Sequence, residues 1–560
     1  TVLGTFALPL ATTVALLALR LRFPIPAIAG AATLLFLFNE GNSMWGGNIP
    51  STLAGEFAFS LGFALSVAFV GLLYRGVERQ RGWRWLAALL ALTGLCHPIA
   101  FLNATAAGLF FLLDRRHFAR NLRFLLLTYG LAVLLMGFWL IPLVGKLPFA
   151  TAINWKWHFS SWRELLPPIL QPVAPLALLD LAWLAVRRRP EDRPLWYLAF
   201  AGLTSVVLFI NATTLGLPEI RFAPFVQLVV LLLAVDALRR LLPLEPSRWP
   251  QDSPLRFAPH VGALAIALAM AAFAQSSSSK IPSWIRWNYT GLESKPSYPL
   301  LQDLMDQVRG SISDPRVAYE NSPRHDRFGS MRIFEDMALL SGRATLEGVL
   351  LQTSINSPSI YFLQNQLSKQ GTGVIPGYLY PAFHPERATP RLALYNAHDV
   401  IAVTPELRTA FEADPSWERV FARDDYAVFH LKDADPHYVR VPRYQPAVLD
   451  SADWKRDFHS WFASDDALEV PLLLASRMPP EERGRFPRAE SPSAPPRVAI
   501  EAECEIEEHI DHLEIEFTTS CPGLPHWIAI SYFPNWQVEG AQEVFLASPG
   551  FLLVVPEGPR

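Results

Sequence analysis

Two carboxylates lie in the segment 39–56, which joins two apolar runs and contains no Lys or Arg. Glu56 directly precedes the apolar run that starts at Phe57. An acid at membrane depth is costly and commonly functional, whereas an acid in the first turn of a helix also stabilises the helix N-terminus. Both interpretations stay open for Glu56. Glu40 and Glu56 are therefore the candidate catalytic carboxylates.

A second polar junction, residues 217–222, holds Arg221 as its single cation, directly before another apolar run. An arginine in this position can bind a phosphate through two parallel hydrogen bonds. It can also extend its charge to the membrane surface or pair with Glu219. Arg221 and Glu219 are therefore candidate substrate-binding residues.

The third junction, residues 154–163, combines three tryptophans with Lys156, His158 and Arg163. Tryptophans mixed with cationic side chains are typical of the membrane interface, and such a cluster could instead recognise a lipid headgroup. We take Lys156 and His158, together with Trp45 of the first junction, as further candidate substrate contacts.

Signatures of soluble enzymes are absent from the sequence. It contains neither a Gly-x4-Gly-Lys-Ser/Thr phosphate loop, nor a His-Glu-x2-His zinc helix, nor a Gly-x-Ser-x-Gly elbow. No metal-ligand set is predicted, and the cofactor stays unknown, with a divalent metal left open. The net charge of −3 gives no reason to expect a nucleic-acid partner.

The elements that carry these junctions are apolar and long. The chain of 560 residues is 51% hydrophobic and 18% charged, with a mean hydropathy of +0.21, and its apolar runs are concentrated in residues 1–275. Runs of this length can cross a bilayer of about 30 Å. We expect spans near residues 3–19, 24–39, 57–74, 124–143, 166–186, 194–212, 224–238 and 257–274.

The stretch 85–113 is too long for one span and short for two. We expect it to break at Cys96-His97-Pro98, because proline removes a helix donor. His97 would then lie either in a tight loop near the outer surface or in the lining of a cavity, and it is a candidate substrate contact.

Arginine clusters separate the two sides of the membrane. With the break at His97, 18 basic residues of the first half face one side and four face the other. The positive-inside rule assigns the side with the 18 basic residues to the cytoplasm. The sequence thus predicts about ten membrane segments, with the C-terminal half extracytoplasmic.

The later half reads as folded soluble protein. We predict a mixed α/β domain over residues 276–440, a linker over 441–496 and a small β domain over 497–560. The linker is indicated by residues 475–496, which are rich in Pro, Glu, Arg and Ser. Cys504 and Cys521 lie on neighbouring predicted strands, and a disulfide between them is plausible in an oxidising compartment.

The ends of the sequence are unusual. It does not begin with Met, and Thr1 leads directly into an apolar run. We therefore expect a fragment that is cut at both ends.

Three segments carry a family resemblance. The run 46–57 (GGNIPSTLAGEF), the GLCHP break at 94–98 and the run 528–541 (IAISYFPNWQVEGA) resemble bacterial membrane proteins described as "6-pyruvoyl-tetrahydropterin synthase-related". Nothing in the chain suggests pterin chemistry. The architecture is similar to the GT-C superfamily, and residues 394–402 (LYNAHDVIA) resemble related proteins implicated in glycosylating cell-envelope polymers.

The resemblance implies a GT-C-like polytopic helical membrane bundle followed by extracytoplasmic α/β and β domains. It also implies a bacterial inner-membrane glycosyltransferase, which transfers sugar from a polyprenyl-phosphate donor to an envelope glycan or lipid acceptor. GT-C enzymes usually carry the catalytic acid in the first outer loop, which this chain would lack. The roles that the resemblance implies are therefore limited to two hypotheses: Glu56 as an acid or metal ligand near the sugar, and Arg221 as a lipid-phosphate partner.

Two other functions are alternatives. One is a non-catalytic membrane protein that binds or assembles envelope components. The other is a lipid or glycan transporter, which would be expected to carry paired charges within its spans. The span acids Asp180 and Asp236 have no obvious partner in the sequence, which disfavours a transporter.

Overall fold

The computed structural model describes residues 1–152, 156–187, 189–242, 244, 249, 252, 254–348, 351, 354–371 and 375–559. The chain divides into two compact units. The first contains Thr1–Gly145 and Asn154–Tyr289, and the second contains Lys146–Ile153 and Thr290–Arg560. The first unit is helical and the second is rich in β-strands, as the sequence predicts in outline.

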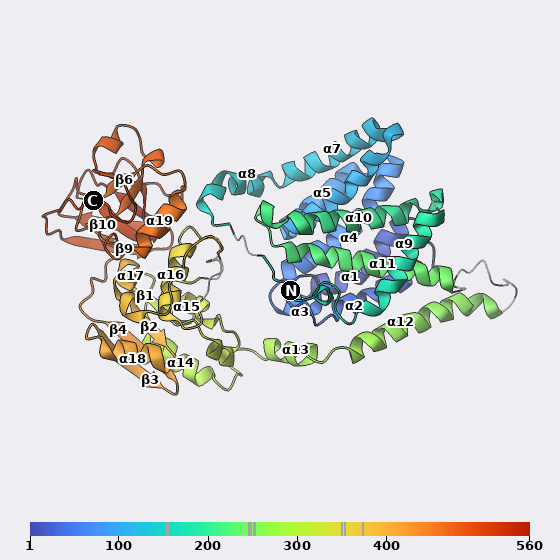
Figure 1. The fold of residues 1–560 in the computed structure, drawn as a ribbon, viewed down its shortest axis with the longest axis horizontal. Helices are drawn as coiled ribbons and strands as arrows, with labels where there is room; N and C mark the ends of the chain where they lie inside the picture. Colours follow the sequence, from blue (N-terminus) through green and yellow to red (C-terminus); the bar gives the residue numbers. More distant parts are fainter. Residues whose placement is uncertain are drawn as a thin grey trace. The chain divides into compact units, whose positions relative to one another are not determined.

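The helices of the first unit follow the apolar runs (Figure 1). They are α1 (Leu3–Ala18), α2 (Ile25–Leu37), α3 (Ile49–Leu53), α4 (Phe57–Arg79), α5 (Trp83–Cys96), α6 (Pro98–Ala107), α7 (Phe118–Leu135), α8 (Gly137–Lys146), α9 (Ala174–Arg187), α10 (Arg193–Asn211), α11 (Ala223–Leu241), α12 (Ala258–Ser276) and α13 (Ile281–Tyr289).

Within the described residues, five helical segments are long and apolar enough to cross a membrane. They are Phe57–Arg79, Arg115–Leu135, Pro190–Asn211, Glu219–Leu241 and Pro254–Ser276. Other apolar helices, such as Leu3–Ala18, are shorter, so a total of about ten segments stays a prediction. In its most apolar stretch α11 is 78% buried and α12 only 17%. α11 is therefore a central helix, whereas α12 lies against α2 with most of its apolar surface exposed.

Small residues bring α1 and α4 into backbone contact. A Cβ at Gly71 would come within 2.3 Å of the Ala15 Cα, and one at Gly4 within 2.4 Å of the backbone of Ser60. In a membrane, helices associate through such close packing, because burial of apolar side chains gives little driving force there. These glycines therefore fix how closely the two helices approach.

The predicted break at His97 is confirmed. α5 ends at Cys96, His97 has an extended backbone (φ −161°, ψ 126°), and α6 begins at Pro98. The His97 side chain accepts a hydrogen bond from the Ile99 N–H at 3.3 Å, so it caps the new helix. Proline at the first helical position leaves no donor unsatisfied.

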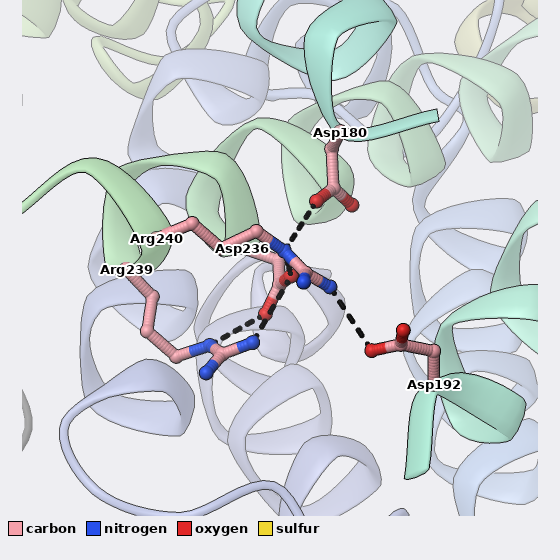
Figure 2. Close-up of polar contacts among 5 residues, drawn as sticks. All are labelled: Asp180, Asp192, Asp236, Arg239 and Arg240. Atoms are coloured by element: carbon pink, nitrogen blue, oxygen red, sulfur yellow. Dashed lines mark hydrogen bonds and ion pairs between the residues drawn. The ribbon is translucent and has the colours of Figure 1, made fainter. Parts of the chain in front are cut away.

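A buried ion cluster joins α9, α11 and the turn Pro190–Asp192 that precedes α10 (Figure 2). The Arg240 Nε lies 2.9 Å from Asp180 Oδ1 and 2.7 Å from Asp236 Oδ2, and its Nη2 lies 3.2 Å from Asp192 Oδ1. Arg239 Nε lies 2.8 Å from Asp236 Oδ1. The expectation that Asp180 and Asp236 lack partners is therefore wrong, because arginines at the end of α11 reach both.

The second unit begins with a four-stranded sheet in the order β1-β2-β4-β3, of which β1 and β2 are parallel. The strands are β1 (Arg316–Tyr319), β2 (Ala397–Ala402), β3 (Trp417–Arg423) and β4 (Tyr426–Leu431), and the helices are α14 (Tyr298–Gln307), α15 (Met337–Ser341), α16 (Ser357–Leu367), α17 (Thr389–Leu394) and α18 (Pro405–Ala413). The hairpin between β3 and β4 turns at Asp424, whose φ of +53° is a left-handed conformation that aspartate tolerates.

A seven-stranded sheet in the order β5-β11-β13-β12-β7-β6-β8 follows. Its strands are β5 (Val439–Arg440), β6 (Ala447–Leu449), β7 (Leu472–Leu474), β8 (Arg488–Ala489), β11 (His526–Ser531), β12 (Phe545–Ala547) and β13 (Phe551–Val554). Residues 441–496 differ from the predicted linker, since they supply β6, β7, β8 and α19 (Trp454–Ala463). Strands of two or three residues are too short to show an alternating pattern in the sequence.

The predicted disulfide is present. Cys504 and Cys521 are bonded, with Cα atoms 5.6 Å apart, and close the ribbon of β9 (Ile506–Asp511) and β10 (Glu514–Thr519). Cys96 is free. The bond spans 17 residues of sequence.

We expect Arg240→Gln to lower the stability of the helical unit by about 3–5 kcal/mol, because it leaves several buried carboxylates without their counter-charge. Asp180 and Asp236 are at most 1% exposed. Thermal unfolding in detergent, followed by intrinsic fluorescence, measures the effect. Arg239→Gln, at a side chain that is 26% exposed, is the matched control. Equal melting temperatures for the two variants would contradict the central role of Arg240.

Replacing both Cys504 and Cys521 by Ser should lower the stability of the second unit by about 3 kcal/mol, since a closed loop of this length restricts the unfolded chain by that amount. Peptide mapping without reductant should recover the two cysteines in one linked peptide pair. Cys96→Ser is the control and should leave the unfolding of the second unit unchanged. Recovery of Cys504 and Cys521 as free thiols would contradict the pairing.

Candidate functional site

Side-chain amides fold the loop between α2 and α3. The Asn48 Nδ2 donates to the carbonyl oxygens of Asn39 at 2.8 Å and Asn42 at 3.1 Å. Asn39 Nδ2 donates to Asn42 Oδ1 at 2.8 Å, and Gln227 Nε2 of α11 donates to the same atom at 3.2 Å. All four side chains are nearly fully buried. Because buried polar groups must be paired, this network fixes one conformation of the loop and ties it to α11.

Close contact with Phe59 requires glycine in the same loop. A Cβ at Gly46 would come within 2.3 Å of Phe59 Cδ1, and its φ of +103° is unfavourable for other residues. The ring of Phe59 is completely buried beneath the loop. The Gly-Gly pair of the 46–57 motif therefore presses the loop onto the first turn of α4.

Glu56 and Arg221 form an ion pair next to Phe59. Arg221 Nη2 donates to Glu56 Oε1, with the two side chains 14% and 20% exposed. The Arg221 guanidinium carbon lies 5.9 Å from the centre of the Phe59 ring, in cation–π range. Glu56 occupies the N-cap position of α4, but its side chain makes no capping hydrogen bond. Its carboxylate therefore serves Arg221 instead of the helix end.

One donor of Arg221 is left over. Its Nη1 is buried and has no hydrogen-bond partner among the described residues. A buried, unpaired donor on a guanidinium costs free energy unless an acceptor arrives. Glu56 therefore uses only part of the hydrogen-bonding capacity of Arg221. The Nη1 group can donate to a second anionic oxygen.

His97 packs against the same ring. Its imidazole packs edge-on against Phe59 with 4.8 Å between centroids. Because Nδ1 accepts from Ile99, a neutral His97 carries its hydrogen on Nε2. Phe59 thus contacts two of the predicted substrate-binding residues, from segments that are more than a hundred residues apart.

Glu219 does not pair with Arg221. It is buried, and its Oε1 accepts a hydrogen bond from the backbone N–H of Trp157. Trp157 in turn packs edge-on against Trp45, with 6.3 Å between ring centres. Trp45 itself is only 3% exposed, in a cluster with Ile220. These contacts anchor the third junction to the first two.

Lys156 and His158 flank Trp157 and are both exposed. Their predicted role in substrate binding stays a prediction. Residues 154 and 155 of the same junction lie outside the described part of the chain. In the described part of that junction, Glu164 Oε1 accepts the Ser160 N–H at 2.8 Å, which closes the segment into a turn.

Glu40 has its own set of partners. Its carboxylate accepts the N–H groups of Lys280 at 2.7 Å and Ile281 at 2.8 Å, and the hydroxyls of Ser278 and Ser279. Burial raises the pKa of Glu40, but these hydrogen bonds outweigh it and hold the pKa below its ordinary value. A carboxylate that is stabilised as an anion is a weak base. Its contacts fasten the N-terminus of α13 to the loop.

The residues that sequence reasoning missed are amides. Gln227 lies within an apolar run, and Asn39, Asn42 and Asn48 are spread over a loop. The density of asparagine in residues 39–48 is the sequence signal that could have indicated them. Among the described residues, no group of three His, Cys, Asp or Glu side chains is arranged to hold a metal ion.

Comparison with known proteins yields two family models. The model described as "6-pyruvoyl-tetrahydropterin synthase related domain; membrane protein" matches residues 1–287, and a domain of unknown function (DUF8559) matches residues 301–442. No curated protein matches the chain.

Among solved structures, the chain is similar to the arabinofuranosyltransferase AftD from Mycobacteria, determined by cryo-EM. The identity is 14% and the TM-score 0.49, over 87% of this chain and 37% of AftD. The chain thus spans little more than a third of the length of AftD. The first family model covers more than half of the chain and includes the GGNIPSTLAGEF and GLCHP motifs. The chain therefore belongs to the family of membrane proteins that the model describes as 6-pyruvoyl-tetrahydropterin synthase related.

Proposed function

We propose that the protein is a membrane glycosyltransferase of the GT-C type. It would transfer a sugar from a polyprenyl-phosphate-linked donor to an envelope glycan or lipid acceptor. The observation that carries this proposal is the Glu56–Arg221 pair, in which one buried guanidinium donor is left without a partner among the described residues. Its location at the start of α4, a helix long enough to span a membrane, suits a donor that stays anchored in the bilayer.

Arg221 would bind the lipid phosphate. Two phosphate oxygens match the fork of a guanidinium, which holds them by parallel hydrogen bonds. Nη1, which has no partner among the described residues, would donate to one oxygen, and Nη2 would exchange Glu56 for the other. The positive charge would then stabilise the phosphate as it leaves, because it lies where negative charge develops.

Glu56 would act as general base. When the phosphate takes over Arg221, the Glu56 carboxylate loses its counter-charge and becomes available to the acceptor hydroxyl. The acceptor oxygen attacks the anomeric carbon, the bond between that carbon and the phosphate oxygen breaks, and the hydroxyl proton moves to Glu56. The products are a new glycosidic bond and a free polyprenyl phosphate.

We also propose on which side of the membrane the second unit lies. A disulfide between Cys504 and Cys521 suits an oxidising compartment, and the arginine asymmetry of the helical half assigns the opposite side to the cytoplasm. We therefore propose a bacterial inner-membrane protein whose second unit is extracytoplasmic.

Turnover of a panel of polyprenyl-phosphate sugars, in the presence of bilayer lipids and envelope glycans, tests the assignment. Glu56→Gln should lower kcat by about 10²–10⁴-fold with little change in KM, as expected for loss of a general base. Arg221→Gln should weaken the binding of polyprenyl phosphate itself, measured without an acceptor. Glu191→Gln, at an exposed acid of the same unit, is the matched control.

Two results would contradict the proposal. Unchanged turnover in Arg221→Gln would show that Arg221 does not bind the lipid phosphate. Binding of polyprenyl phosphate through Arg221 without sugar transfer to any acceptor identifies a non-catalytic binding protein instead.

A further inference from the structure

A pocket of about 640 Å³ opens at the hairpin that joins α4 to α5. Its polar lining comes from Arg75, Arg79 and Arg81, and its apolar lining includes Leu72, Trp85 and Leu89. The turn is tight, with left-handed conformations at Gln80 (φ +52°) and Gly82 (φ +83°), and all three arginines line the same pocket. The pocket is remote from the proposed active site, because Glu56 lies at the other end of the 23-residue helix α4.

No acid among the described residues balances these charges. The acidic residue nearest in sequence, Glu78, is absent from the lining and pairs instead with Arg20 of the α1–α2 connection, at 3.1 Å. Within the described ranges, Arg75, Arg79 and Arg81 make no ion pair. Three guanidinium groups around one pocket repel one another. A bound anion would relieve that repulsion and accept several of their hydrogen bonds.

The lining also matches the depth profile of a bilayer. α4 is about 34 Å long at roughly 1.5 Å per residue, close to the thickness of a hydrocarbon core. Arg79 therefore reaches the boundary opposite Glu56, while Leu72 lies about two turns deeper. Trp85 is 84% exposed, and exposed tryptophan is typical of the membrane interface. The pocket thus has a cationic rim at the level of the lipid headgroups and an apolar wall at the level of the acyl chains.

We propose that this pocket binds an anionic phospholipid. The phosphate lies among Arg75, Arg79 and Arg81, and one acyl chain runs along Leu72, Trp85 and Leu89. Charge and apolar lining together select an amphiphile over either a soluble anion or a neutral lipid. The inference does not depend on the proposed transferase activity, since none of these residues belongs to that site.

Native mass spectrometry of the purified protein tests the binding, with phosphatidylglycerol and phosphatidylcholine as probes. We expect wild-type protein to retain phosphatidylglycerol at least tenfold more strongly than phosphatidylcholine. The triple variant R75Q/R79Q/R81Q should lose that preference. The control R115Q/R116Q/R120Q removes the same charge from exposed arginines outside the pocket and should keep it. Equal retention of phosphatidylglycerol by both triple variants would overturn the proposal.

A second variant tests the apolar wall. Trp85→Ala removes an exposed side chain, so its folding should be unaffected, and thermal unfolding checks this. It should weaken binding of long-chain phosphatidylglycerol several-fold while leaving a dihexanoyl form unchanged. Equal loss of binding for both forms would show that the acyl chain does not lie on this wall, which contradicts the proposal.

Inorganic phosphate distinguishes the two sources of the anion. At concentrations matched to the lipid, it should displace little bound phosphatidylglycerol, because it lacks the chains that contact the wall. Displacement as effective as that by phosphatidylglycerol itself would mean that the pocket takes a soluble phosphate and would overturn the assignment to a lipid.

Discussion

The ion pair between Glu56 and Arg221 is the contact around which the three polar junctions are organised. It joins the N-terminus of α4 to the turn that begins α11, across 165 residues of sequence. An ion pair that is mostly buried is costly unless its geometry is held by other contacts. Here the amide network of Asn39, Asn42 and Asn48 fixes the loop that leads to Glu56. The hydrogen bond from Trp157 to Glu219 fixes the turn that carries Arg221. The buried ring of Phe59 contacts both Arg221 and His97.

Local features of the chain could be predicted from sequence. The break at His97 follows from one proline in an apolar run. The Cys504–Cys521 bond was also expected, since both residues flank neighbouring strands. These features depend on residues that are close in sequence, where turn chemistry and periodicity act directly.

Features that depend on distant partners could not be predicted. The sequence offered Glu219 as the nearest partner for Arg221, but the turn Glu219–Phe222 leaves the two side chains with different partners. Asp180 finds its counter-charge in Arg240, 60 residues away. The short strands between residues 441 and 496 pair with one another and, through β7, with β12, which comes much later in the sequence. Tertiary packing decided each of these outcomes.

The order of strands in the seven-stranded sheet constrains how the second unit is made. β13 (Phe551–Val554) lies between β11 and β12, and β12 in turn pairs with β7. β6 can pair with β7 and β8 soon after synthesis, but β7 (Leu472–Leu474) must wait for β12, which emerges much later at roughly 5–20 residues per second of synthesis. During that interval the leucines of β7 and its unpaired edge are exposed to other chains. The sheet therefore closes only after β12 and β13 have been synthesised, so its folding is completed late in translation or after it.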